Sequence, residues 1–173
     1  MKNDDLDFIY KPFKNIYFFG KFKLSKKKYF SDLLYIKYWL HSLLKVLLKN
    51  GKKKLAENII KFVYLGLIKK IKNLRYFFLK IQKNMHLPLK LNSKVIAGRK
   101  LYIPIILKDN KEIMFIIRFI ILSLKNRNEK TFKERLLNEL FDTFYNKGFS
   151  IKKKIQYNKE IKDCLPNLRY LRY

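Results

Sequence analysis

Cysteine, histidine, glycine and proline are all scarce in this chain of 173 residues. It has one cysteine, Cys164, two histidines, His41 and His86, five glycines and four prolines. One thiol excludes an internal disulfide framework, and three Cys or His side chains are too few to favour a zinc cluster or a Cys/His nucleophile. We therefore expect no metal and no cofactor.

Targeting signals and long apolar runs are also missing. The most apolar stretch, Ile113 to Leu124, is interrupted by Arg118 and is shorter than the roughly 20 residues that cross a bilayer. Three aspartates among the first seven residues are unlike a transit peptide, which is rich in Arg and poor in acids. We expect a buried helix, no transmembrane segment and no cleavable address. A protein of this kind that works in an organelle is more easily made there than imported.

Catalytic motifs are absent too. The chain has no Gly-rich phosphate loop, zinc-ligand set or serine-hydrolase elbow. Glu139 and Asp142 are three residues apart, but a catalytic pair needs a pocket that separates the two pKa values, and no pattern here indicates one. We expect that the protein is not an enzyme.

Positive charge is abundant. The 41 Lys and Arg against 13 Asp and Glu give a formal net charge of +28, and 15 Phe with 12 Tyr argue against disorder. Self-repulsion at this charge is relieved when lysines lie against phosphates, so the partner is a nucleic acid or an anionic bilayer. The bias toward Lys, Ile, Asn, Phe and Tyr suggests an AT-rich coding genome, such as that of an organelle.

The periodicity predicts an N-terminal extension over residues 1–30 and one helical domain over 31–173. The extension interleaves basic and aromatic residues, which suits RNA and equally suits packing on a neighbouring protein. A first helix follows Ser31, its candidate N-cap, and ends near Gly51. A second helix buries Leu55 among others, and a third covers about 73–85. Three lysines (Lys52, Lys53 and Lys54) at the start of the second helix indicate either a nearby phosphate or a solvated charge run.

The period then changes from helical to alternating. Residues 89–107 alternate apolar and polar around a turn at Ala97-Gly98, which predicts a two-stranded β-hairpin with Pro104 on an edge. Lys94, Arg99 and Lys100 make its tip a cationic arm. Two strands alone need support from the body of the protein or from a partner.

Three further helices are expected after the hairpin, and the first two can be bounded by their caps. Asp109 is a candidate cap for a helix over about 111–126 that is apolar all round, so we expect Arg118 to be buried beside a carboxylate or phosphate. Thr131 to Glu134 has capping-box spacing and opens the next helix, which Gly148 ends. Its buried stripe is expected to be Phe132, Leu136, Leu137, Leu140, Phe141 and Phe144.

The acidic residues of that helix are expected on its outer face. Arg135 and Glu139, four apart, can pair there, and Asp142 can neutralise a nearby cation. A last short helix starts with Lys152, Lys153 and Lys154, and the chain ends in a tail with Arg169 and Arg172 between tyrosines.

From about residue 43 to the C-terminus, the chain resembles the bacterial-type universal small-subunit ribosomal protein seven family. The resemblance is carried by Asn50-Gly51-Lys52-Lys53, Gly98 and Pro104 of the hairpin, Arg127-Asn128-Glu129-Lys130-Thr131, Asn138-Glu139-Leu140, Gly148, Lys152-Lys153 and Tyr170-Leu171-Arg172-Tyr173. It departs from the family at Ala97, where the family has a second glycine, and at Cys164-Leu165-Pro166, which breaks a helix usually continuous there.

The resemblance implies a mainly α-helical bundle of about six helices with a protruding hairpin. It also implies a structural protein that binds the 3′ major domain of small-subunit rRNA and helps assemble the subunit head. The hairpin would lie near the exit-site tRNA and the mRNA path, beside the small-subunit proteins numbered nine and eleven. With the compositional bias, this gives a mitochondrial ribosome as the expected location. The expected rRNA-binding residues are Lys52, Lys53, Lys54, Lys94, Arg99, Lys100, Lys108, Lys111, Arg118, Arg127, Lys130, Arg135, Lys152, Lys153, Lys154, Arg169 and Arg172.

Two alternatives remain open on the residues alone. One is a peripheral membrane protein that uses basic amphipathic helices, and the other is a general nucleic-acid packaging protein. Retention on anionic vesicles after nuclease treatment would indicate the first, whereas release from a particle by RNase would indicate a ribosomal protein.

Overall fold

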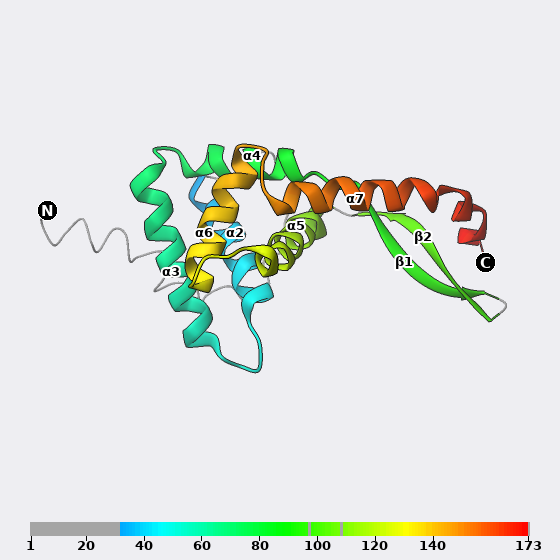
Figure 1. Ribbon diagram of the computed structural model, residues 1–173, viewed down its shortest axis with the longest axis horizontal. Coiled ribbons are helices and arrows are strands. Elements are labelled where there is room, and N and C mark those ends of the chain that lie inside the picture. Colours follow the sequence, from blue (N-terminus) through cyan, green and yellow to red (C-terminus); the bar gives the residue numbers. More distant parts are fainter. Residues whose placement is uncertain (1–31, 97, 108, 173) are drawn as a thin grey trace, which may run out of the picture.

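The computed structural model describes residues 32–96, 98–107 and 109–172. The predicted extension over 1–30 and the Ser31 cap lie outside these residues. In chain order the elements are α2 (Asp32–Leu47), α3 (Lys53–Lys70), α4 (Leu74–Met85), β1 (Leu89–Ile96), β2 (Arg99–Ile106), α5 (Asp109–Ser123), the 3-10 helix η2 (Leu124–Asn126), α6 (Phe132–Phe144), α7 (Phe149–Asp163) and the 3-10 helix η3 (Leu165–Arg172). The α-helices gather into a bundle from which the hairpin projects (Figure 1). The predicted mainly α fold with a hairpin arm is confirmed.

Helix boundaries follow local capping chemistry. Asn73 caps α4 by accepting a hydrogen bond from the Tyr76 N–H at 3.0 Å, and Thr131 caps α6 by accepting one from the Glu134 N–H at 3.3 Å. After α2 the chain turns through Asn50 and Gly51, with φ of 51° and 69°. These left-handed conformations favour Asn and Gly, so the turn between the first two helices lies where it was expected.

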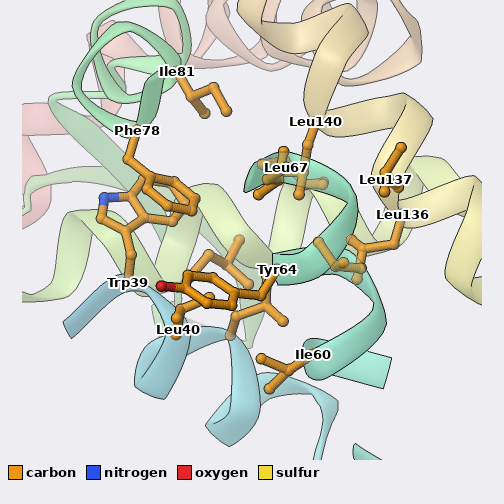
Figure 2. Close-up of a cluster of buried hydrophobic side chains, with 14 of the residues drawn as sticks. Trp39, Leu40, Ile60, Tyr64, Leu67, Phe78, Ile81, Leu136, Leu137 and Leu140 are labelled. Carbon is orange, nitrogen blue, oxygen red and sulfur yellow. The ribbon is translucent and has the colours of Figure 1, made fainter. Parts of the chain in front are cut away.

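The core joins α2, α3, α4, α5 and α6. Trp39 of α2 is fully buried and stacks on Phe78 of α4, with the ring centroids 5.1 Å apart. Leu67 of α3 and Leu140 of α6 point into the same cluster (Figure 2). Each such side chain contributes about 1.5–3 kcal/mol by leaving water. Gly66 allows α3 to approach α6, because a Cβ there would collide with the side chain of Leu137.

Three residues predicted to be buried are exposed. Arg118 lies on the solvent side of α5, in line with the exposed Lys111 and Leu122, while Ile116, Ile117 and Ile120 form the buried side. A helix turns 100° per residue, so spacings of 4 and 7 place these exposed residues on one stripe. The expectation that Arg118 is a buried cation was therefore wrong. Leu55 and Phe132 are likewise 59% and 38% exposed.

The hairpin lies at its predicted position, and Pro104 within it costs no hydrogen bond between the two strands. β1 and β2 are antiparallel with Leu91 opposite Pro104, and the Leu91 N–H donates outward to Tyr157 Oη of α7 at 2.8 Å. In an antiparallel pair, the backbone groups of both residues point the same way relative to the ladder, so the backbone of Pro104 also faces away from β1. The N–H that proline lacks is therefore not needed for a bond between the two strands. On the other edge, Asn167 Nδ2 of η3 donates to the Tyr102 carbonyl at 3.0 Å. The C-terminal segment thus supports the hairpin.

The turn between α6 and α7 differs from the prediction. α6 ends at Phe144, and the chain passes through Asn146 with φ of 59° before Gly148, with φ of 93°, begins α7. Gly148 is therefore the N-cap of α7 instead of the C-terminal glycine of α6. The break expected at Cys164-Leu165-Pro166 is present, since α7 ends at Asp163 and η3 starts at Leu165.

Candidate nucleic-acid interface

The predicted RNA-binding cations fall into two groups according to exposure. The exposed ones can meet a partner directly: they are Lys52, Lys54, Arg99, Lys100, Lys111, Arg118, Lys130, Lys152 and Arg169. The half-buried ones are Lys53, Lys94, Arg127, Arg135, Lys153 and Lys154. The side chains of Lys108 and Arg172 lie outside the described part of the chain.

The start of α3 concentrates positive charge at a helix N-terminus. Lys52 is the N-cap and provides no side-chain cap, and the first turn carries no acidic residue. Lys53 lies 3.9 Å from Glu57, four residues on, which compensates one of the three cations. The exposed Lys52 and Lys54 add to the partial positive charge of the helix end, so this corner favours an anion.

The hairpin carries a second group of cations away from the bundle (Figure 1). Gly98, with φ of 74°, makes the tight turn, and Arg99 and Lys100 follow it as exposed residues. The Lys100 ammonium lies 5.9 Å from the Tyr102 ring centroid, and Tyr102 is 48% exposed. The arm therefore presents charges and an aromatic side chain at its solvent-facing surface.

Arg127 has an internal role in addition to any contact with a partner. Its side chain is 12% exposed and forms ion pairs with Glu129 and Glu139, each at 2.6 Å, and with Asp142. Hydrogen bonding to Glu129 raises the pKa of Arg127 and lowers the pKa of Glu129 to about 2. The guanidinium thereby ties the loop before α6 to two carboxylates on α6 itself.

Glu139 is the centre of this junction, and the prediction for it was wrong. We expected it on the outer face paired with Arg135, but it is fully buried. Its Oε2 accepts from Arg127, while Oε1 accepts from the Ser150 backbone N–H at 2.8 Å and from Ser150 Oγ. Arg135 instead donates its Nε to the Glu129 carbonyl at 2.6 Å.

The bond from Ser150 explains how α7 begins. Its N-cap is Gly148, which has no side chain to accept a bond from the first turn, and that turn has no acidic residue of its own. The Glu139 carboxylate supplies the missing acceptor and the negative charge from a neighbouring helix. It offsets the repulsion between the helix N-terminus and the lysines that follow.

Two of those lysines cap the C-terminal ends of other helices. Lys153 Nζ donates to the Leu122 carbonyl of α5 at 2.8 Å, and Lys154 Nζ donates to the Asn84 carbonyl of α4 at 2.7 Å. Burial lowers the pKa of Lys154. Both ammonium groups lie at the negative ends of helices, where a cation is stabilising. Lys152, in contrast, is exposed and points to the surface.

Sequence reasoning missed the polar residues that complete the junction. Asn84 Nδ2 donates to the carbonyls of Thr143 and Phe144 at the end of α6, at 2.9 and 3.0 Å. Ser123 Oγ lies 2.6 Å from Ser150 Oγ and also donates to Glu139. A lone Asn or Ser within a helical pattern carries no signal for such contacts, because the partners are 16 to 60 residues away.

The described part of the chain gives little support for a metal site or a membrane span. It contains no group of three or more His, Cys, Asp or Glu side chains placed to hold a metal ion. His86 Nδ1 lies 2.6 Å from Glu112 Oε1, which is one pair within the bundle. None of the described helices combines the length and apolar character that a bilayer span requires.

Comparison with known proteins gives consistent matches. The family model described as "Ribosomal protein S7p/S5e" matches residues 20–162. Small ribosomal subunit protein uS7 of Carsonella ruddii is 31% identical over 142 residues, which cover 79% of this chain and 91% of that protein. The uS7 protein of Mycoplasma genitalium is 34% identical over 119 residues, covering 68% and 76%. Small ribosomal subunit protein uS7m of Reclinomonas americana is 42% identical over 64 residues, covering 37% and 40%.

Proposed function

The chain belongs to the ribosomal protein S7p/S5e family, and on that premise we propose that its exposed lysines and arginines bind the rRNA of a mitochondrial small subunit. Membership makes the chain a structural constituent of the small ribosomal subunit and not an enzyme. rRNA and neighbouring ribosomal proteins are the partners that the family implies.

The rRNA-binding proposal is supported by the separate positions of acidic and basic side chains in the described residues. Glu129, Glu139 and Asp142 are paired with Arg127 at the α6 and α7 junction, where Glu139 is fully buried. The exposed lysines of α3, the hairpin and α7 are thus left without these carboxylates as neutralising partners. Lysines placed against phosphates release counterions from the RNA, which provides a large favourable term in binding.

Within this proposal the predicted residues have two roles. The exposed cations, such as Lys52, Arg99 and Lys152, make direct phosphate contacts. Arg127 and Lys154 position them, because their polar groups hold the ends of helices through bonds inside the protein. Phosphate contacts of this kind fix the orientation of a protein on folded RNA without reading its sequence.

The finer placement in the ribosome is also a proposal. We assign the chain to the 3′ major domain of the rRNA, where it helps assemble the subunit head beside the proteins numbered nine and eleven. The hairpin, held by Tyr157 and Asn167, is a stiff arm suited to lie near the exit-site tRNA and the mRNA path. The similarity to uS7m and the bias toward Lys, Ile and Asn support a mitochondrial, organelle-encoded origin.

The test compares the salt dependence of rRNA binding in the full chain and two variants. Lys152→Glu should weaken binding to the small-subunit rRNA and reduce the slope of log K against log salt by about 0.7–0.9 for each phosphate that is no longer neutralised. Lys154→Met is the matched control, since Lys154 is held by the Asn84 carbonyl and its replacement should lower stability without changing the slope. An unchanged slope for Lys152→Glu would remove that residue from the interface.

A second measurement addresses the particle itself. Sucrose-gradient sedimentation of the organelle extract should place the protein with the small-subunit rRNA, and RNase should release it. Sedimentation with anionic vesicles after nuclease treatment would contradict the proposal and favour a membrane-surface role instead.

A further inference from the structure

A cavity of about 370 Å³ opens at the end of α6, between that helix and the C-terminal end of α3. Its walls include the aromatic rings of Phe141, Phe144 and Tyr145, together with Lys70 and Asn138. The volume is within the range of pockets that hold small ligands. We call it the Tyr145 pocket. None of the RNA-binding residues expected from the sequence, apart from Arg127 in its wall, belongs to it.

The aromatic rings of this pocket lie one against the next from the core to the surface. Phe144 stacks on the fully buried Phe77 with the ring centroids 4.9 Å apart, so its position is fixed by the core. Tyr145 contacts Phe144 edge to face at 5.2 Å and is 64% exposed. A large aromatic side chain at the surface, anchored on rigid rings, can stack with a flat partner at little cost in conformational entropy.

Two lysine ammonium groups lie over these rings. Lys80 Nζ is 4.3 Å from the Phe144 ring centroid, and Lys70 Nζ is 5.0 Å from the Phe141 centroid. Each ammonium group is at the end of a flexible chain, so it can turn from the ring toward a phosphate of a nucleotide that is held nearby. The Asn138 amide and the Asp142 carboxylate add polar groups to the wall that can meet a base edge.

We propose that the Tyr145 pocket binds an unpaired nucleobase of RNA, stacked on the Tyr145 ring, with its phosphates held by Lys70 and Lys80. The proposal rests on the rRNA-binding function proposed above and adds to it a contact with the base of one nucleotide. Aromatic rings combined with cations are typical of sites for single-stranded RNA, whereas an apolar protein segment would use the rings and leave both ammonium groups without a partner.

The experiment uses the full chain with a short unpaired oligouridylate and with an abasic ribose phosphate of the same length. Stacking on an aromatic side chain contributes enough that Tyr145→Leu should weaken oligouridylate binding at least about fivefold. The same variant should bind the abasic strand as tightly as the parent chain does. Phe62→Leu is the matched control, because Phe62 is also an exposed ring near a lysine, at 5.8 Å from Lys133 Nζ, but lies outside the pocket.

Equal oligouridylate affinities for Tyr145→Leu and the parent chain would overturn the proposal, as would an equal loss on the abasic strand. Ultraviolet crosslinking of the native small subunit gives a second outcome: a nucleotide joined to Tyr145 supports the pocket, and a protein segment there overturns it. Failure of the rRNA-binding proposal is recognised separately, since the protein would then sediment with anionic vesicles after nuclease treatment instead of with the small-subunit rRNA. The nucleobase contact is measured by comparing the loss of affinity that Tyr145→Leu causes for oligouridylate with the loss that it causes for the abasic ribose phosphate.

Discussion

Replacing Glu139 by glutamine is the sharpest perturbation of the α6 and α7 junction. The variant keeps the size of the side chain and an oxygen that can accept from the Ser150 N–H. Its amide nitrogen, however, would face Arg127 Nη1, which lies 2.6 Å from Oε2 in the parent protein. The change removes a charge-assisted hydrogen bond, which is worth about 1.5–3 kcal/mol, and leaves a buried donor unsatisfied at a further cost of about 1–3 kcal/mol.

Arg127 retains Glu129 and Asp142, so the expected loss is smaller than for a buried cation left alone. We expect the free energy of unfolding to fall by about 2–4 kcal/mol. Removing one partner of a buried ion pair typically costs more, about 3–5 kcal/mol. Urea unfolding should show this as a midpoint lowered by about 1–2 M at a slope of about 2 kcal/mol per molar, the middle of the range of about 1–3 kcal/mol per molar for small proteins. Moderate salt during the measurement screens the surface charges but not the buried pair.

Glu134→Gln is the control for this experiment. Glu134 is on the same helix, is exposed and lies in the first turn, where a carboxylate contributes about 0.3–1 kcal/mol through the helix dipole. The two variants should therefore differ clearly in their urea midpoints. If Glu139→Gln unfolds at the same urea concentration as Glu134→Gln, the Glu139 carboxylate does not hold the start of α7.

Two further predictions concern the same region. Thr131→Ala should lower the free energy of unfolding by about 1 kcal/mol through loss of the α6 cap, and an unchanged unfolding midpoint would contradict that role. The pKa of Glu129 is lowered from 4.5 to about 2 by its bonds to Arg127, so its ionised form stabilises the fold above pH 4.5 and this contribution is lost as the pH falls toward about 2. Glu129→Gln should accordingly show a flatter decline of the thermal midpoint over that window than the parent protein, and parallel declines would refute the assignment.

Local signals in the sequence were sufficient for most of the architecture. Thr131 caps a helix with a clear apolar period, and Gly98 marks the hairpin turn between two alternating runs. Caps, turns and periodicity depend on neighbours within a few residues, which is why their positions could be inferred from a single chain. The mainly α fold with its hairpin followed from these signals.

Long-range contacts were not accessible in this way. Glu139 was expected on the outer face, opposite the apolar stripe of α6, whereas it is buried. Its pairing depends on Arg127, 12 residues away, and on Ser150 across a turn. Arg118 was placed inside because apolar residues surround it in the sequence, although the helical period directs it to solvent. For Arg118 the error came from judging one residue by the composition around it, when its face on the helix decides the outcome.

The placement of the carboxylates explains how a chain with a formal charge of +28 can keep a fixed shape and still present its charge outward. Exposed acidic groups such as Glu134 can pair with lysines and lower the attraction to RNA, whereas the buried Glu139 stabilises α7 at its positive end. Lys153 and Lys154 complement it at the negative ends of α5 and α4. Internal charges thus hold the helix ends, and because their partners are within the protein, the exposed lysines are left to neutralise phosphates.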